Sequence, residues 1–207
     1  MFLLLMISFA VAQPDERGKQ FRPPDLVELV TLDSLIKLDI RYATTNNFTN
    51  RKMYGQARAF LQRPAAEALV RADKRLRASG YGLVVLDAYR PWSVTKKFWD
   101  ETPPEKRDYV ANPKQGSRHN RGGAVDVTLY DLLTGEEVVM PSGYDDFSER
   151  ASPDYQGGTS DQRRARDLLR HVLEKEGFTV EKNEWWHFNY KDWQSYQILD
   201  IPFEKVN

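Results

Sequence analysis

Apolar residues recur at helical spacing in three parts of the chain. Over residues 64–80 the apolar stripe follows Pro64, which is tolerated in the first turn of a helix, and a glycine ends it. Over residues 160–177 the stripe follows Ser160, the expected N-cap, and again ends at a glycine. A shorter helix is expected over residues 93–99. The pattern predicts two long helices and a short one.

Alternating or continuous apolar residues predict strands between these helices. Strands are expected at 36–40, 83–86, 124–129, 137–140, 178–180 and 185–190. Because helices and strands come in mixed order, the expected fold class is α+β, with helices packed on one side of a mainly antiparallel sheet.

Two stretches show neither the helical spacing nor the strand alternation of apolar residues. Residues 13–25 are polar and contain prolines, and we expect a flexible lead-in there. Residues 141–160 are rich in Pro, Gly, Ser and Asp, so they form either a loop that covers a site or a disordered segment. The length of the remainder, residues 26–207, predicts a single domain.

The N-terminus contains an apolar run from Phe2 to Val11, and Ala10-Val11-Ala12 precedes Gln13 as small residues precede a signal-peptidase site. Residues 1–12 are therefore expected to be a signal peptide, although no Lys or Arg precedes the run. The alternative is an apolar segment of the core. Cleavage would give a periplasmic or secreted protein without a stable membrane anchor; without cleavage the protein would be cytoplasmic.

Composition removes several classes of function. The chain has 30 basic and 30 acidic residues, with no basic stripe of the kind that binds nucleic acid. It has no cysteine, which excludes disulfides, thiolate metal sites and a cysteine nucleophile. Neither observation determines the oligomeric state.

The candidate chemistry lies around two of the three histidines. Asp126 follows His119, and Glu184 precedes His187 by three residues. Two imidazoles and one carboxylate are the ligand set of a catalytic zinc that keeps a position open for water. The carboxylate three residues from its histidine is then free to act as general base. These residues predict a zinc peptidase with one Zn²⁺ per chain.

Strand geometry constrains these residues further. Along 124–129, Asp126 faces the same side as its small neighbour Ala124, which leaves room for a metal. In a regular strand Glu184 and His187 would face opposite sides, so we expect Glu184 at the entrance of its strand rather than on a bulge or in a helix. The third histidine, His171, lies off its helix's apolar stripe and is expected on the surface.

The segments Ser117–Asp126 (SRHNRGGAVD) and Glu184–His187 (EWWH) together resemble the paired motifs of the M15 zinc peptidases, which have a hedgehog-like fold. The stretches DIRYAT, NFT and DAYRP, which begin at Asp39, Asn47 and Asp87, are similar to those of D-alanyl-D-alanine dipeptidases of the VanX type. The resemblance covers roughly residues 26–190. The apolar N-terminus departs from the cytoplasmic resistance enzymes of that type.

The resemblance implies roles for particular residues. His119, Asp126 and His187 would bind zinc, and Glu184 would be the general base. Arg90, which spacing alone places either in a cleft or in a surface ion pair, would stabilise the oxyanion. The substrate would be the free dipeptide D-alanyl-D-alanine.

Further substrate contacts are expected around these residues. Ser117 would hydrogen-bond the substrate or orient its own loop. Asp145 and Asp146 are candidates for holding the substrate ammonium, with plain surface solvation as the alternative. Tyr42 and Trp186 would wall the pocket, with a role in the core as the alternative.

Two other functions compete with the dipeptidase. A D,D- or L,D-carboxypeptidase or endopeptidase of the same fold, acting on peptidoglycan stem peptides, would need an open cleft. A non-catalytic zinc-binding module would need neither Glu184 nor Arg90, so their presence favours an enzyme.

Overall fold

The computed structural model describes residues 11–206. A five-stranded sheet with the order β2-β4-β5-β7-β6 forms its centre. Its strands are β2 (Lys37–Leu38), β4 (Tyr81–Asp87), β5 (Ala124–Asp131), β7 (Glu184–Tyr190) and β6 (Phe178–Glu181). β2 pairs with β4 in parallel, and the three other pairs are antiparallel. The predicted α+β class with a mainly antiparallel sheet is confirmed.

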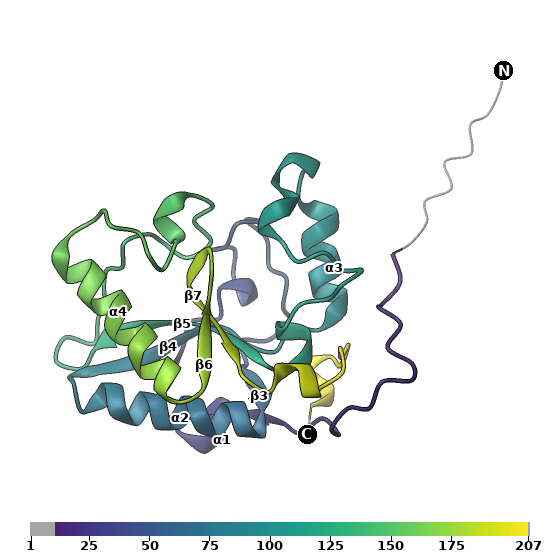
Figure 1. The fold of residues 1–207 in the computed structure, drawn as a ribbon, viewed down its shortest axis with the longest axis horizontal. Coiled ribbons are helices and arrows are strands. Elements are labelled where there is room, and N and C mark those ends of the chain that lie inside the picture. Colours follow the sequence, from purple (N-terminus) through teal and green to yellow (C-terminus); the bar gives the residue numbers. More distant parts are fainter. Residues whose placement is uncertain (1–10, 207) are drawn as a thin grey trace.

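Helices α2 (Arg63–Arg77) and α4 (Ser160–Lys175) pack beside each other on one face of this sheet (Figure 1). Figure 1 shows α3 (Trp92–Glu101) apart from this pair. Two short elements were not predicted. The one-turn helix α1 (Leu29–Leu32) contacts α2, and a separate two-stranded sheet joins β1 (Leu26–Glu28) to β3 (Phe60–Gln62).

Strand β5 separates the apolar core from the polar face of the sheet. Val125, Val127 and Leu129 are fully buried in one cluster with leucines of α2 and α4. Because side chains alternate along a strand, Asp126 and Thr128 point to the opposite face. The site described below is built on that face, as the sequence pattern predicted.

An irregularity between β4 and β5 brings a second aspartate to the polar face. Val85 pairs with Val127, but Asp87 rather than Leu86 lies opposite Asp126. Directly paired residues share a face of the sheet. In a regular register Leu86 would occupy this place and Asp87 would point toward the core. The extra residue therefore turns the Asp87 carboxylate toward Asp126.

Three local predictions differ from the structure. The segment 137–140 makes a single bridge, between Tyr130 and Glu137, rather than a strand. The strand expected at 36–40 is reduced to Lys37–Leu38. The N-cap of α4 is Thr159 rather than Ser160, because Thr159 and Gln162 bond each other's backbone N–H in a capping box.

The lead-in lies along the C-terminal segment of the domain without forming a helix or strand. Glu16 accepts a hydrogen bond from the Ile198 amide and forms an ion pair with Arg121. The Arg22 amide donates to the Ser195 carbonyl. These contacts connect part of the lead-in to the domain. The expected signal peptide falls largely on residues 1–10, outside the described residues. From residue 11 to 206, no helix has the length and hydrophobicity needed to cross a membrane.

Candidate active site

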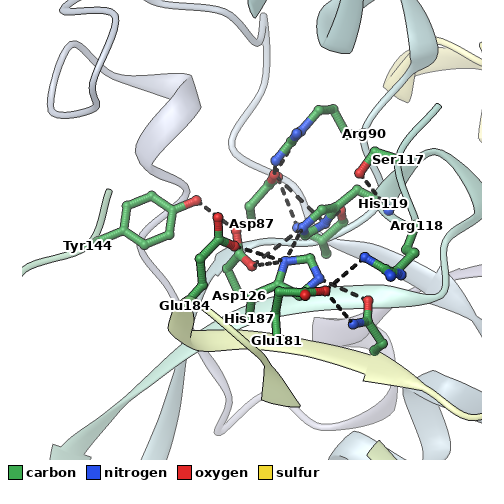
Figure 2. Close-up of polar contacts among 12 residues, drawn as sticks. Asp87, Arg90, Ser117, Arg118, His119, Asp126, Tyr144, Glu181, Glu184 and His187 are labelled. Atoms are coloured by element: carbon green, nitrogen blue, oxygen red, sulfur yellow. Dashed lines mark hydrogen bonds and ion pairs between the residues drawn. The ribbon is translucent and has the colours of Figure 1, made fainter. Parts of the chain in front are cut away.

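The structure brings His119, Asp126 and His187 together (Figure 2). His119 is in the short 3₁₀ helix η3 (His119–Arg121), and Asp126 pairs directly with His187 across β5 and β7. Asp126 Oδ1 lies 3.4 Å from His119 Nε2 and 3.1 Å from His187 Nδ1. The two ring nitrogens are 3.1 Å apart. All three side chains are buried.

The outer atoms of these side chains have partners of their own. His119 Nδ1 lies 2.7 Å from the Ala88 carbonyl oxygen, which can only accept, so Nδ1 carries the proton and Nε2 presents its lone pair to the cluster. His187 Nε2 lies 2.9 Å from Asn189 Oδ1. Asp126 Oδ2 accepts a hydrogen bond from the Tyr144 hydroxyl at 2.8 Å. One atom of each residue therefore faces the others.

This donor set fits a divalent metal ion. Asp126 Oδ1 is buried without a hydrogen-bond donor among the described residues. Burial would raise the pKa of Asp126, but His119 and His187 outweigh it and hold that pKa well below its usual range. Burial would lower the pKa of His187, but Asp126 more than offsets this and raises it to about 9. The cluster thus stabilises positive charge at the point where the three residues meet.

Glu184 begins β7, as expected, and faces the cluster for an additional reason. Thr179 of β6 pairs with Asn189, but the register then shifts so that Glu181 lies opposite Glu184. This shift brings Glu184 to the same face as His187 despite the odd separation. Its Oε2 lies 3.6 Å from His187 Nδ1. Burial, assisted by the charge of Asp126 and opposed by His187, raises the pKa of Glu184 to about 7.

Arg90 is buried beside the cluster rather than exposed in a surface ion pair. Its Nε and Nη2 lie 3.1 and 2.6 Å from Asp87 Oδ2, and its guanidinium carbon is 4.7 Å from the centre of the Phe98 ring. Asp87 Oδ1 in turn accepts from the Tyr54 hydroxyl at 2.7 Å. Contacts on both sides of Asp87 therefore hold the guanidinium in one orientation.

A cavity of about 690 Å³ opens onto these residues, and Asp145 and Asp146 line it. The Tyr42 hydroxyl lies 3.1 Å from Asp145 Oδ1, and the Phe48 amide donates to Asp145 Oδ2 at 3.3 Å. Burial and the nearby charge of Asp126 raise the pKa of Asp145 to about 7. The two polar partners of Asp145 are uncharged, so its charge is not neutralised by them.

The other candidate residues from the sequence either line the cavity or support the residues that do. Tyr42, Trp186 and Ser117 all line the cavity. Ser117 Oγ accepts from the His119 amide at 3.2 Å, so it orients the loop that carries His119. Tyr42 and Trp186 are also buried, which combines both roles considered for them. His171 is exposed on α4, as expected.

Residues 141–158, which we call the cover loop, are ordered against the site. The Trp185 indole N–H donates to Ser142 Oγ at 2.9 Å, and Tyr144 reaches Asp126 as described. Farther along, the Phe147 ring stacks on Tyr109 at 4.7 Å between centroids. Of the two alternatives for this segment, the structure shows the cover.

Comparison with known proteins identifies the family of the chain. The family model of the M15 peptidases, described as D-ala-D-ala dipeptidase, matches residues 24–205. The chain belongs to the M15 peptidase family. It is 33% identical over 179 residues to the D-alanyl-D-alanine dipeptidase of Escherichia coli K12, covering 86% of this chain and 91% of that protein.

Two further likenesses differ in weight. The D-alanyl-D-alanine dipeptidase of Enterococcus faecalis V583 is 33% identical over 186 residues, covering 81% of this chain and 88% of that protein. Among solved structures, the LD-carboxypeptidase LdcB aligns with a TM-score of 0.48 and 21% identity, covering 90% of this chain and 80% of that one. That structural likeness is too distant to carry an argument.

The motifs therefore identified the M15 family correctly, but sequence reasoning missed three residues around the site. Asp87 stands three residues before Arg90 at the end of a buried strand, and only the irregular register shows that it faces the site. Asn189 follows His187 by two, the spacing at which strand residues share a face, and this signal was available. Tyr144 lies in an irregular loop, where no periodicity indicates direction.

Proposed function

We propose that this M15 peptidase hydrolyses the free dipeptide D-alanyl-D-alanine and uses zinc to do so. One observation carries the substrate proposal. The Asp145 carboxylate, held by uncharged partners, lines the same cavity as Glu184 and the His119–Asp126–His187 cluster. A carboxylate there is suited to an α-ammonium group, which a free dipeptide carries next to its scissile bond. The related dipeptidases support the same substrate class.

His119, Asp126 and His187 would hold one zinc ion per chain through Nε2, Oδ1 and Nδ1. Two imidazoles and a carboxylate are a common ligand set for catalytic zinc, although such sites also accept other divalent ions. When bound, zinc lowers the pKa of water to about 7 and polarises a carbonyl group.

Glu184 would move the proton. With its pKa near 7, the carboxylate accepts a proton from the attacking water and returns it to the nitrogen of the leaving D-alanine. Its position at the cavity wall allows contact with both the water and the scissile amide.

Arg90 would stabilise the oxygen that becomes negative when water adds to the scissile carbonyl. The guanidinium has five N–H groups, and two of them are directed at Asp87. Because Asp87 fixes its orientation before substrate binds, little reorganisation is needed as the charge develops.

Asp145 would select for a short substrate. Its ion pair with the substrate ammonium is lost when that nitrogen is part of a peptide bond, as in a stem peptide. Tyr42 and Phe48, which hold Asp145, also line the cavity. The free dipeptide is therefore favoured over longer peptides. Ser117 and Trp186 would complete the walls around it.

We also propose export, on the sequence of residues 1–12 alone. Removal of this segment before Gln13 would place the enzyme in the periplasm or outside the cell, where peptidoglycan turnover releases dipeptides. N-terminal sequencing of the protein purified from its own cells tests this: a mature start at Gln13 supports export, and an intact Met1 contradicts it.

The first test of the activity uses the chain from Gln13 and its Glu184→Gln variant. Zinc content is measured by elemental analysis, and D-alanine release from D-alanyl-D-alanine is measured alongside a tripeptide that ends in the same two residues. We expect the variant to keep its zinc while kcat falls by about 10²- to 10⁴-fold, the usual contribution of a general base.

Other results would replace the proposal. Faster turnover of the tripeptide than of the dipeptide would assign the protein to the stem-peptide carboxypeptidases. Full zinc loading without turnover of either peptide would leave a zinc-binding module.

A further inference from the structure

A chain of three polar side chains continues outward from His187, away from the metal-facing cluster. His187 Nε2 lies 2.9 Å from Asn189 Oδ1, and Asn189 Nδ2 donates to Glu181 Oε2 at 3.1 Å. Arg118 Nη1 donates to the same Glu181 oxygen at 2.8 Å, a contact visible in Figure 2. The chain therefore runs from a buried imidazole to a half-exposed arginine.

The pairing of strands β6 and β7 places these residues together. His187 and Asn189 are two residues apart on β7 and share a face. Thr179 pairs with Asn189, and Glu181 lies two residues beyond Thr179 on β6, so it shares that face too. Glu181 thereby meets Asn189 at the point where the regular register ends.

The chemistry of the last two members determines the direction of every hydrogen bond. The ionised Glu181 carboxylate can only accept, so the NH₂ group of Asn189 must face it. Asn189 Oδ1 then faces His187 and must receive a proton from Nε2. His187 is therefore held with Nε2 protonated, so that Nδ1, which faces Asp126, is the nitrogen available to a metal ion. Arg118 reinforces this direction because it keeps Glu181 ionised and in place: Arg118 opposes the effect of burial and lowers the pKa of Glu181.

We propose that Asn189 is a positioning residue for the metal ligand His187, and that Glu181 and Arg118 fix its polarity. This inference rests on the metal centre of the proposed function. Because the Asn189 amide lies between the two, Glu181 orients the hydrogen bond to His187 without placing its own negative charge against the imidazole. Arg118 and Glu181 both line the cavity, so the chain also links the cavity wall to the ligand.

The test measures zinc affinity directly, by competition with a chromophoric chelator, on the chain from Gln13. Asn189→Leu keeps the approximate shape of the side chain but removes the acceptor from His187. We expect its zinc affinity to fall about 10- to 100-fold, as is typical when the outer partner of a metal-binding histidine is lost. Arg118→Leu, at the far end of the chain, should lower the affinity less.

A double variant tests whether zinc affinity depends on an acceptor for His187 Nε2 or on asparagine itself. In Asn189→Asp with Glu181→Gln, the new carboxylate accepts from His187 Nε2 and the new amide donates to that carboxylate. The bond from His187 keeps its direction, although residue 181 now donates to residue 189, so zinc affinity should exceed that of Asn189→Leu by about tenfold. Asn189→Asp alone places two carboxylates against each other and should bind zinc less tightly than the double variant.

Asp73→Asn is the control for a general loss of stability. Asp73 is buried on α2, across the sheet from the cluster, where it accepts from the Leu83 amide and pairs with Arg77. This variant should lower the melting temperature without changing zinc affinity. ¹⁵N-histidine NMR of the zinc-loaded protein adds a direct observation, because the chain has only three histidines. The wild type should show a protonated His187 Nε2 that is protected from exchange, and Asn189→Leu should lose this protection.

The possible outcomes separate a failure of this inference from a failure of the proposed function. Wild-type zinc affinity in Asn189→Leu, or no recovery in the double variant, would overturn the role of Asn189 while leaving the peptidase intact. An equal affinity loss in Asp73→Asn would reduce the role to general stability and overturn it as well. A wild-type protein that neither binds zinc nor cleaves the dipeptide would instead refute the proposed function.

Discussion

The two walls of the cavity use carboxylates in opposite ways. The strand wall, to which β5 and β7 contribute Asp126 and His187, is backed by Asp87 of β4, whose charge is matched by Arg90 at 2.6 Å. The cover loop contains Asp145, whose hydrogen bonds come from the uncharged Tyr42 hydroxyl and Phe48 amide. One carboxylate is neutralised within the protein, and the other remains available to a ligand.

This difference separates stability from binding. Asp87 and Arg90 satisfy each other before any substrate arrives, so the strand wall is rigid and pre-organised. Asp145 is held at a price in folding free energy, since burial raises its pKa to about 7 and its backbone has a φ of 57°, in the left-handed region. A cation that enters the cavity would recover part of that free energy as binding.

The largest effect is expected when the matched pair of the strand wall is broken. Asp87→Leu leaves the buried Arg90 guanidinium without its counter-ion. Removing one partner of a buried ion pair typically costs about 3–5 kcal/mol of folding free energy. Urea unfolding of the metal-free protein measures this loss, and kcat should fall as well because Arg90 is no longer oriented.

The double variant Asp87→Leu with Arg90→Met tests whether the loss comes from the unpaired charge. Replacing both members by apolar residues of similar size should restore most of the folding free energy without restoring activity. If the double variant is as unstable as Asp87→Leu, packing rather than charge holds the strand wall, and the contrast with Asp145 would be lost.

Asp145→Asn should have the opposite combination of effects. The amide oxygen can still accept from Tyr42 and Phe48, but the charge for the substrate ammonium is gone. A hydrogen bond to a charged group contributes about 1.5–3 kcal/mol, so KM for D-alanyl-D-alanine should rise about 10- to 100-fold. Steady-state kinetics measure this, with zinc content unchanged. An unaltered KM would show that the cover loop does not bind the substrate ammonium.

The same variant should be more stable than the wild type at alkaline pH. The pKa of Asp145 rises from an ordinary value of 3.8 to about 7 on folding. Between these values the folded protein binds a proton that the unfolded chain has released, so its stability falls as the pH rises through this window. Asparagine avoids this loss. Melting temperatures should therefore show a larger gain for Asp145→Asn at pH 8 than at pH 5.

The strand wall could largely be predicted from the sequence. Alternation along β5 places Asp126 opposite the apolar residues Val125 and Val127, and the motifs identify the family to which the cluster belongs. Helix positions followed from apolar spacing and glycine stops. These predictions succeeded because each depends on residues that are neighbours in sequence.

The features that the sequence could not show depend on pairing between distant segments. Asp87 faces the site only because the β4–β5 register shifts. Glu184 was expected at the site from its place at the strand entrance, but the β6–β7 register shift that also turns it there was not. A shift of this kind is decided by the whole sheet, and the local pattern of either strand does not contain it. The cover loop has no period at all, so Asp145 could be named as a candidate while the contact made by Tyr144 could not be foreseen.

Tyr144 connects the two walls, and its removal gives the smallest expected effect. Its hydroxyl, carried by the cover loop, donates to Asp126 Oδ2 on β5 at 2.8 Å. Tyr144→Phe removes this bond and keeps the ring that packs edge-on against Trp186. A single hydrogen bond contributes about 1 kcal/mol, so KM should rise about fivefold with kcat nearly unchanged.

Hydrogen exchange of the cover loop decides whether this small change reflects the link between the walls. If the hydroxyl fastens the loop, amides of residues 141–158 should exchange faster in Tyr144→Phe, while those of β5 and β7 keep their protection. Exchange that stays slow while zinc affinity falls would show that the hydroxyl acts on the Asp126 ligand alone. The cover loop would then be held by its other contacts, Ser142 with Trp185 and Phe147 with Tyr109. Its position would not depend on the strand wall.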